Sequence, residues 1–215
     1  LKVMQKIVLQ VAITLLFLYG LHLNGVLTSA VVLPIVGFVD LGILFYPIAF
    51  LLIIFMVNAV NLTDGIDGLA SSVTFVVMLA YVIAAGVLNY FHLAVYAAAV
   101  AGGCAGFLLW NFHPAKVFMG DTGSMYLGGA VTALAFCMSR PELLLFFGFI
   151  YICEAGSVVI QVSYFKATHG KRIFKMTPIH HSFEMDGWSE EKIVASFSLV
   201  AAAAAALGLV FIRLS

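Results

Sequence analysis

LGILFYPIAFLLIIFMVNAVNLTDGIDG, residues 41–68, runs from an unbroken apolar segment into a row of polar side chains. The apolar part suits a helix that crosses the roughly 30 Å hydrocarbon core of a bilayer. Four polar residues then recur at every third position: Asn58, Asn61, Asp64 and Asp67. This spacing predicts that they share one helix face. A carboxylate within a bilayer costs roughly 2.5–3.5 kcal/mol, so the two acids indicate a cationic or phosphorylated partner.

The composition identifies an integral membrane protein. Of the 215 residues, 64% are hydrophobic and 9% are charged, and the mean hydropathy is +1.14. The apolar segments are too continuous for the alternating strands of a membrane barrel. We therefore expect an all-α fold, a polytopic transmembrane helical bundle, with residues 1–215 forming one integral-membrane domain. The formal net charge is zero and indicates no class of partner.

About seven segments are candidate membrane spans. They are residues 7–21, 41–58, 69–88, 93–110, 124–138, 143–165 and 193–212. Residues 24–40 are also apolar, but Gly25, Pro34 and Gly37 interrupt them. An extended loop, a hairpin and a re-entrant segment all remain open for this stretch.

The basic residues predict the orientation, because cytoplasmic loops carry an excess of Lys and Arg. Alternating crossings put Arg140 and Arg213 on one side of the membrane. The other side receives the remaining basic residues, which are Lys2, Lys6, Lys116, Lys166, Lys171, Arg172, Lys175 and Lys192. That second side is predicted to be cytoplasmic.

Three polar stretches from separate loops fall on this cytoplasmic side. They are residues 61–67, 111–121 and 166–192. We therefore expect a one-sided site at the inner membrane surface, whereas a carrier would place more polar groups near the midplane.

The acids of these stretches have two readings. Asp64 and Asp67 can accept hydrogen bonds from a base or sugar, or can hold a hard cation through oxygen ligands. Helix capping by Asp64 is the simpler alternative. Asp121 precedes an apolar helix, which predicts an N-cap. The same helix start favours anions, so Asp121 can also hold Mg²⁺ while residues 122–124 receive phosphate oxygens.

Histidines and an aromatic residue complete the set. His180 and His181 lie in a loop with Lys171, Arg172 and Lys175, where imidazoles can donate to a diphosphate or simply belong to a solvated basic loop. Phe118 can stack on a base or anchor the membrane boundary. We expect Glu154, which lies mid-span, to be paired or protonated inside the bundle, and His113 to order its own loop.

Three stretches carry a resemblance to a known family. NAVNLTDGIDGLA (residues 58–70), NFHPAKVFMGDTGSMYLG (111–128) and MTPIHHSFEMDGWSEE (176–191) resemble the polyprenyl-phosphate N-acetylhexosamine-1-phosphate transferases. The last stretch is similar to the phospho-N-acetylmuramoyl-pentapeptide transferases (MraY type). The likeness covers essentially the whole chain.

The resemblance implies a reaction in peptidoglycan synthesis. Such enzymes transfer phospho-N-acetylmuramoyl-pentapeptide from its UDP carrier to undecaprenyl phosphate, giving lipid I and UMP with the aid of Mg²⁺. It further implies a multi-pass protein of the bacterial cytoplasmic membrane with its site facing the cytoplasm. The implied partners are UDP-MurNAc-pentapeptide, undecaprenyl phosphate, the lipid bilayer and a second copy in a homodimer, with no nucleic acid.

The resemblance also implies roles for individual residues. Asp121 would be the metal ligand and, with Asp64, Asp67, His180 and His181, would form the catalytic group. The substrate-binding residues would be Asn61, Asn111, Phe118 and Lys6, with Phe118 stacking near uracil.

The chain departs from the family pattern in two places. The family carries an adjacent Asp-Asp pair just before the segment where this chain begins, and the chain has no such pair. We therefore expect the chain to match the C-terminal two-thirds of a family member, with N-terminal helices absent. Ser182 replaces a frequent third histidine. Two alternatives stay open: a sister transferase that uses UDP-N-acetylglucosamine, and a noncatalytic membrane subunit or transporter.

Overall fold

The computed structural model describes residues 3–214, so Lys2, one of the basic residues used for the orientation, lies outside the described part. Long helices dominate it: α1 (Val3–Leu23), α2 (Phe45–Thr63), α3 (Leu69–Val87), α4 (Phe91–Asn111), α5 (Gly120–Cys137), α7 (Phe149–Ala167) and α9 (Glu190–Leu214). Between them lie the shorter elements β1 (Ala30–Leu33), β2 (Gly37–Asp40), η1 (Gly42–Leu44), η2 (Pro141–Leu143), α6 (Leu144–Phe147) and α8 (Ile179–Met185). The predicted all-α bundle is confirmed, with one small hairpin added.

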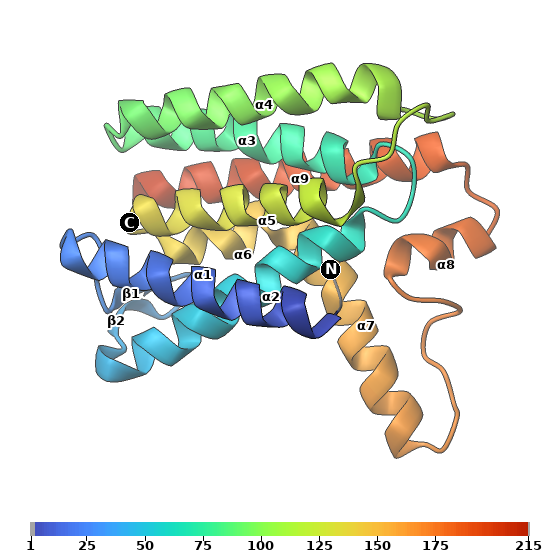
Figure 1. Ribbon diagram of the computed structural model, residues 1–215, viewed down its shortest axis with the longest axis horizontal. Coiled ribbons are helices and arrows are strands. Elements are labelled where there is room, and N and C mark those ends of the chain that lie inside the picture. Colours follow the sequence, from blue (N-terminus) through green and yellow to red (C-terminus); the bar gives the residue numbers. More distant parts are fainter. Residues whose placement is uncertain (1–2, 215) are drawn as a thin grey trace.

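The helices form stacked layers (Figure 1). α4 covers α3, α9 and α5 lie beneath them, and α1 and α2 form the opposite side. α3 packs mainly on α4 and α9, while α2 packs on α5 and α7. α7 slants away from the bundle, and the chain returns through α8 to α9.

Spanning capacity agrees with a membrane protein. Within residues 3–214, five helices are long and apolar enough to cross a membrane, or six if the bent pair of α6 and α7 is one span. Each of the about seven predicted segments is helical. The predicted span that is not among these six is α5. It begins GDTGS, and this polar first turn lowers the hydropathy of a helix of only 18 residues.

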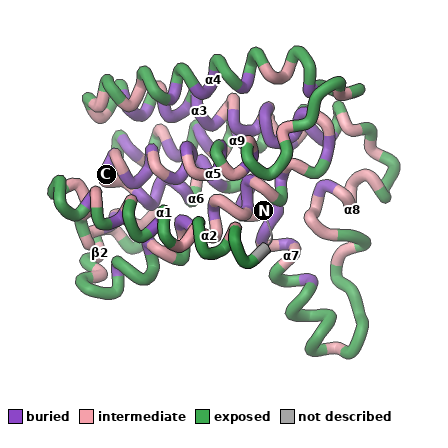
Figure 2. The backbone as a smooth tube through the Cα atoms, viewed as in Figure 1, coloured by how far each residue is buried: buried purple, intermediate pink, exposed green. Residues whose placement is uncertain are grey.

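The break between α6 and α7 was not predicted. The segment expected at residues 143–165 is bent by 82° at Gly148. The backbone amide of Gly148 still bonds to the Leu144 carbonyl at 2.9 Å, so the helix turns sharply rather than unwinding. Beyond the bend, the outer part of α7 is largely exposed (Figure 2), while the inner part is buried.

Residues 24–40, left open from sequence, contain a β-hairpin. β1 and β2 pair antiparallel, with Ala30 opposite Asp40 and Leu33 opposite Gly37. The Asp40 carboxylate accepts a hydrogen bond from Ser29 Oγ at 2.6 Å and from the Gly42 amide at 2.9 Å. These bonds close the hairpin at the end of the bundle opposite α8 (Figure 1).

The core lies where α2, α3 and α5 meet. Met56, Val60, Val77 and Leu134 are almost fully buried there. α2 and α5 approach closely at Gly128, since a Cβ at this position would overlap the backbone of α2. Small residues permit this kind of contact between membrane helices, and it fixes the height of the first turn of α5 against the last turns of α2.

Candidate functional site

The loops that carry the polar stretches gather at one end of the bundle. The α2–α3 connection, the α4–α5 connection and α8 all lie at the end opposite the hairpin (Figure 1). The first of these begins where α2 ends, at Thr63, with Asp64 as the C-cap residue at φ −80° and ψ 49°. Gly68 at φ +76° then precedes α3.

One sequence prediction about this turn is wrong, and one of the alternatives left open is excluded. Asn58 and Asn61 lie on α2, but Asp64 and Asp67 lie beyond its end, so the four do not share a helix face. Two glycines within four residues stop the helix, because glycine favours helix ends. Asp64 also does not cap α3, whose N-cap is Gly68 with no side-chain capping bond.

A first cluster forms around Asp121, in the first turn of α5. Its carboxylate pairs with the Lys6 ammonium of α1 and accepts a hydrogen bond from Asn61 Nδ2 at 3.1 Å. The same Asn61 nitrogen lies 2.8 Å from Ser124 Oγ. The N-cap prediction for Asp121 is wrong, because α5 begins one residue earlier, with Met119 at the N-cap position and no side-chain capping bond.

The Lys6–Asp121 pair points to function more than to stability. Its side chains are 31% and 52% exposed, and such exposed pairs contribute only about 0–1 kcal/mol. Yet it joins residues 115 positions apart. The structure thus places the Lys6 ammonium beside the carboxylate that is expected to bind Mg²⁺.

The Asp64 carboxylate makes no contact that would stabilise the fold among the described residues. It is half-buried, and among residues 3–214 its side chain has no hydrogen-bond or ion-pair partner. Burial raises the pKa of this carboxyl above its ordinary value, because desolvation disfavours the charged form. A cation near Asp64 would offset that cost.

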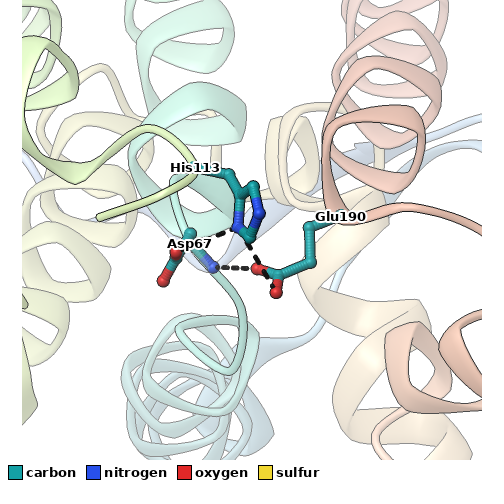
Figure 3. Close-up of side chains that lie close together, drawn as sticks. All are labelled: Asp67, His113 and Glu190. Carbon is teal, nitrogen blue, oxygen red and sulfur yellow. Dashed lines mark hydrogen bonds and ion pairs between the residues drawn. The ribbon is translucent and has the colours of Figure 1, made fainter.

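A second cluster joins the α2–α3 connection, the α4–α5 connection and the first residue of α9 (Figure 3). His113 Nδ1 lies 3.2 Å from Asp67 Oδ2 and 3.5 Å from Glu190 Oε1. The Asp67 carboxylate also accepts from the Ala115 amide at 2.9 Å. Glu190 Oε2 in turn accepts from the Asp67 amide at 3.0 Å. His113 does order its loop, as expected, by tying it to the acidic turn and to α9.

The two neighbouring histidines have different surroundings. His180 is fully buried, and its Nδ1 lies 3.0 Å from Oε2 of the equally buried Glu154. His181 is half-buried, and its Nδ1 lies 2.5 Å from Glu184 Oε2 within α8. Glu154 is therefore paired inside the bundle, as predicted. Only His181 has its side chain partly in solvent.

Asn111 and Phe118 also differ. Asn111 is 3% exposed. Its amide donates to the Val117 carbonyl at 2.9 Å and accepts from Ser71 Oγ at 3.3 Å. Its polar atoms thus hold the α4–α5 connection in place. Phe118, at the end of that connection, is 75% exposed and leaves its ring open for a planar partner.

Two groups of residues have the chemistry to hold a metal ion. Asp121 offers carboxylate oxygens, the ligands that Mg²⁺ prefers. Asp64 follows three residues after Asn61, which bonds to Asp121, and offers a second carboxylate. Asp67, His113 and Glu190 place three ligand atoms within 4.8 Å of one another. An imidazole nitrogen in that set suits transition metals better than Mg²⁺.

Sequence reasoning missed Glu190 and the partner of Glu154. Glu190 stands in SEE at the start of α9, where acids are common because of the helix dipole. No local pattern shows that it reaches a turn 123 residues away.

Comparison with known proteins identifies the family. The profile of glycosyl transferase family 4 matches residues 1–139. The chain belongs to this family. It is 46% identical over all 215 of its residues to the phospho-N-acetylmuramoyl-pentapeptide-transferase of Caldicellulosiruptor bescii, covering 66% of that protein.

Two further relatives carry the same name. The chain is 47% identical to the protein of Acetivibrio thermocellus over 91% of this chain and 60% of the relative. It is 48% identical to the protein of Clostridioides difficile over 93% of this chain and 62% of the relative. The chain thus spans 60–66% of the length of these relatives. The resemblance inferred from the three motifs is confirmed, and the chain is a multi-pass membrane protein of family 4.

Proposed function

We propose that this chain forms the larger part of an enzyme that transfers phospho-N-acetylmuramoyl-pentapeptide from its UDP carrier to undecaprenyl phosphate. The products are lipid I and UMP. The observation that carries the proposal is the first cluster, in which α1, α2 and α5 bring Lys6, Asn61 and Asp121 together at the loop end of a membrane bundle. The similarity to three transferases over nearly the whole chain supports this substrate pair.

The donor set of the cluster fits Mg²⁺. Asp121 is half-exposed and offers carboxylate oxygens at the first turn of a helix, and Asp64 has a carboxylate whose burial calls for a counter-charge. Both are hard oxygen ligands, and Mg²⁺ usually binds through one or two carboxylates together with substrate phosphates. When bound, Mg²⁺ neutralises charge on the diphosphate and on the leaving UMP.

The chain's own residues then bind and orient the two anions. Lys6 offers an ammonium to the phosphates, and the first amides of α5 offer donors at a helix N-terminus, which favours phosphate. These groups stabilise charge that shifts from the attacking lipid phosphate to UMP as one phosphorus–oxygen bond forms and another breaks. His181 is the imidazole with access to solvent and is assigned to the diphosphate or sugar.

The UDP-sugar donor is assigned to the acidic turn. In this proposal Asp64, Asp67 and Asn61 line its pocket, Phe118 stacks on the uracil, and Asn111 shapes the connection that carries Phe118. Aromatic stacking contributes about 1–3 kcal/mol per base. His180 stays in the site as a buried residue beneath the turn.

The surroundings of the site are part of the proposal. The loop end faces the cytoplasm of a bacterial inner membrane, as the basic residues predict. Residues 1–215 act as one integral-membrane domain, and the protein forms a homodimer.

The test is Mg²⁺-dependent UMP release by the complete protein in detergent, with undecaprenyl phosphate as acceptor. UDP-MurNAc-pentapeptide and UDP-N-acetylglucosamine are supplied in parallel. We expect UMP release only with the first donor and only with Mg²⁺. Preference for the second donor would show that the protein is the sister transferase that uses UDP-N-acetylglucosamine. Saturable flux across vesicles without UMP release would show that it is a transporter.

A further inference from the structure

Glu154 is a buried acid with no role in the proposed binding of substrate. It lies in the N-terminal part of α7, its side chain is fully buried, and its Oε2 lies 3.0 Å from His180 Nδ1. The two residues come from different elements, α7 and α8. A buried pair of this kind is weak evidence for stability, because desolvation offsets much of the attraction. The pair therefore calls for another explanation.

The second nitrogen of the His180 ring points to one. His180 Nε2 is buried, and among residues 3–214 it has no hydrogen-bond partner. The ring lies directly against Gly65, where a Cβ would overlap Nε2 and Cε1. The imidazole thus packs against Gly65, the residue that follows Asp64 in the turn. Only a glycine leaves room for it there.

The neighbouring ring does not share this position. The centroids of His180 and His181 lie 4.1 Å apart, but His181 pairs with Glu184 of its own helix and is half-buried. One imidazole is thus enclosed below the acidic turn while the other reaches solvent. Two identical side chains next to each other in sequence have different tasks.

We propose that Glu154 is a positioning residue for the transfer reaction: through His180 it supports the Asp64–Gly65 turn in its active geometry, and His181 alone contacts substrate. This rests on the proposed function. The Glu154 carboxyl accepts a hydrogen bond from His180 Nδ1–H, which fixes the tautomer and the ring plane. The ring then holds the turn at one height relative to Asn61 and Asp121, so the acid of the turn faces the diphosphate.

The experiment compares three variants of the complete protein: Glu154→Gln, Gly65→Ala and Glu142→Gln. Glu142 is the matched control, since it is also buried, pairs with Arg140 and has one oxygen without a partner among residues 3–214. It lies at the hairpin end. We expect Glu154→Gln and Gly65→Ala to lower kcat by about 10- to 100-fold, the range for residues that orient a functional side chain. KM for the UDP-linked donor stays near wild type, and Glu142→Gln keeps kcat.

A second readout separates this inference from the proposed function. Hydrogen exchange of the amides of residues 65–69 is measured in the same proteins, and we expect faster exchange in Glu154→Gln but not in Glu142→Gln. If wild-type protein releases no UMP, the proposed function fails and the exchange data still decide the support role. Unchanged kcat and unchanged exchange in Glu154→Gln would overturn the inference. An equal loss of kcat in Glu154→Gln and Glu142→Gln would show that Glu154 has only a structural role, and would also overturn the inference.

Discussion

The two ends of the bundle treat their charged residues differently. At the hairpin end, Arg140 pairs with Glu142, two residues away, and Asp40 bonds to Ser29 and Gly42 beside it. At the loop end, besides the local contact of His181 with Glu184 in α8, polar contacts join Lys6 to Asp121, His113 to Asp67 and His180 to Glu154. These span 26 to 115 positions of the chain. Local pairs finish a turn, whereas distant pairs hold separate loops in one place.

The loop end also leaves one acid unused. The carboxylate of Asp40 has partners that lower its pKa, chiefly the Ser29 hydroxyl and then the Gly42 amide. The carboxylate of Asp64 has none within the described residues, and burial raises its pKa. An acid kept at a cost in stability, beside a site that attracts cations, is the pattern expected of a binding site.

The largest effect is expected from Asp121→Asn. The amide keeps the size of the side chain but removes the charge proposed to hold Mg²⁺ and to pair with Lys6. We expect Mg²⁺-dependent UMP release to fall by about 10²–10³-fold, the range for loss of one electrostatic stabiliser at a reacting centre. Near wild-type release by a folded Asp121→Asn protein would remove the metal assignment.

Asp64→Asn should separate activity from stability. We expect kcat to fall by about 10–100-fold while thermal stability at neutral pH without Mg²⁺ rises. The folded-state pKa of Asp64 is raised, so its cost is absent below the ordinary carboxyl pKa and is fully present above the folded value. The gain should therefore vanish in acid and shrink when Mg²⁺ is added. Melting curves across pH check this, and a variant less stable than wild type at neutral pH would contradict it.

The second cluster is expected to affect binding more than chemistry. His113→Ala removes the imidazole that joins the α4–α5 connection to Asp67 and Glu190. We expect KM for the UDP-linked donor to rise about tenfold, which corresponds to about 1.4 kcal/mol, with kcat changed much less. Initial rates over a range of donor concentrations measure both. A fall in kcat with unchanged KM would place this cluster at the reacting centre instead.

Asp40→Asn, at the hairpin end, should have the smallest effect on activity. The lowered pKa of Asp40 contributes stability above the ordinary carboxyl pKa, and that contribution is lost as pH falls through the lowered folded value. The variant should thus melt slightly earlier than wild type at neutral pH and alike in strong acid, with unchanged UMP release. A loss of activity would break the contrast between the two ends.

The sequence was sufficient for the long helices, while the roles of the site residues stay predictions. Long apolar runs predicted the long helices, and the motifs predicted that Asn61, Asp64 and Asp121 belong to one site. The sequence-based prediction was wrong about where α2 ends, because a helix can stop within two or three residues. Asp64 and Asp67 follow the i, i+3 spacing of a helix. However, α2 ends at Thr63, and Gly65 and Gly68 lie in the turn that follows.

Long-range partners were also beyond the sequence. Glu154 was expected to be paired, but its partner His180 lies in a different helix, and the periodicity of α7 carries no information about α8. The same holds for Glu190, whose contacts lie in two other connections, and the 82° bend at Gly148 was not expected either.

The most direct test of one converged Mg²⁺ site is cation binding itself. Mn²⁺, as a stand-in for Mg²⁺, is titrated into the complete protein with saturating UMP and followed by electron paramagnetic resonance. The proteins are wild type, Asp121→Asn, Asp64→Asn and Glu190→Gln. We predict that the tight Mn²⁺ signal is lost in Asp121→Asn, is weakened in Asp64→Asn and is kept in Glu190→Gln. Unchanged binding in the first two variants, or loss in Glu190→Gln alone, would contradict the account and move the metal to the second cluster.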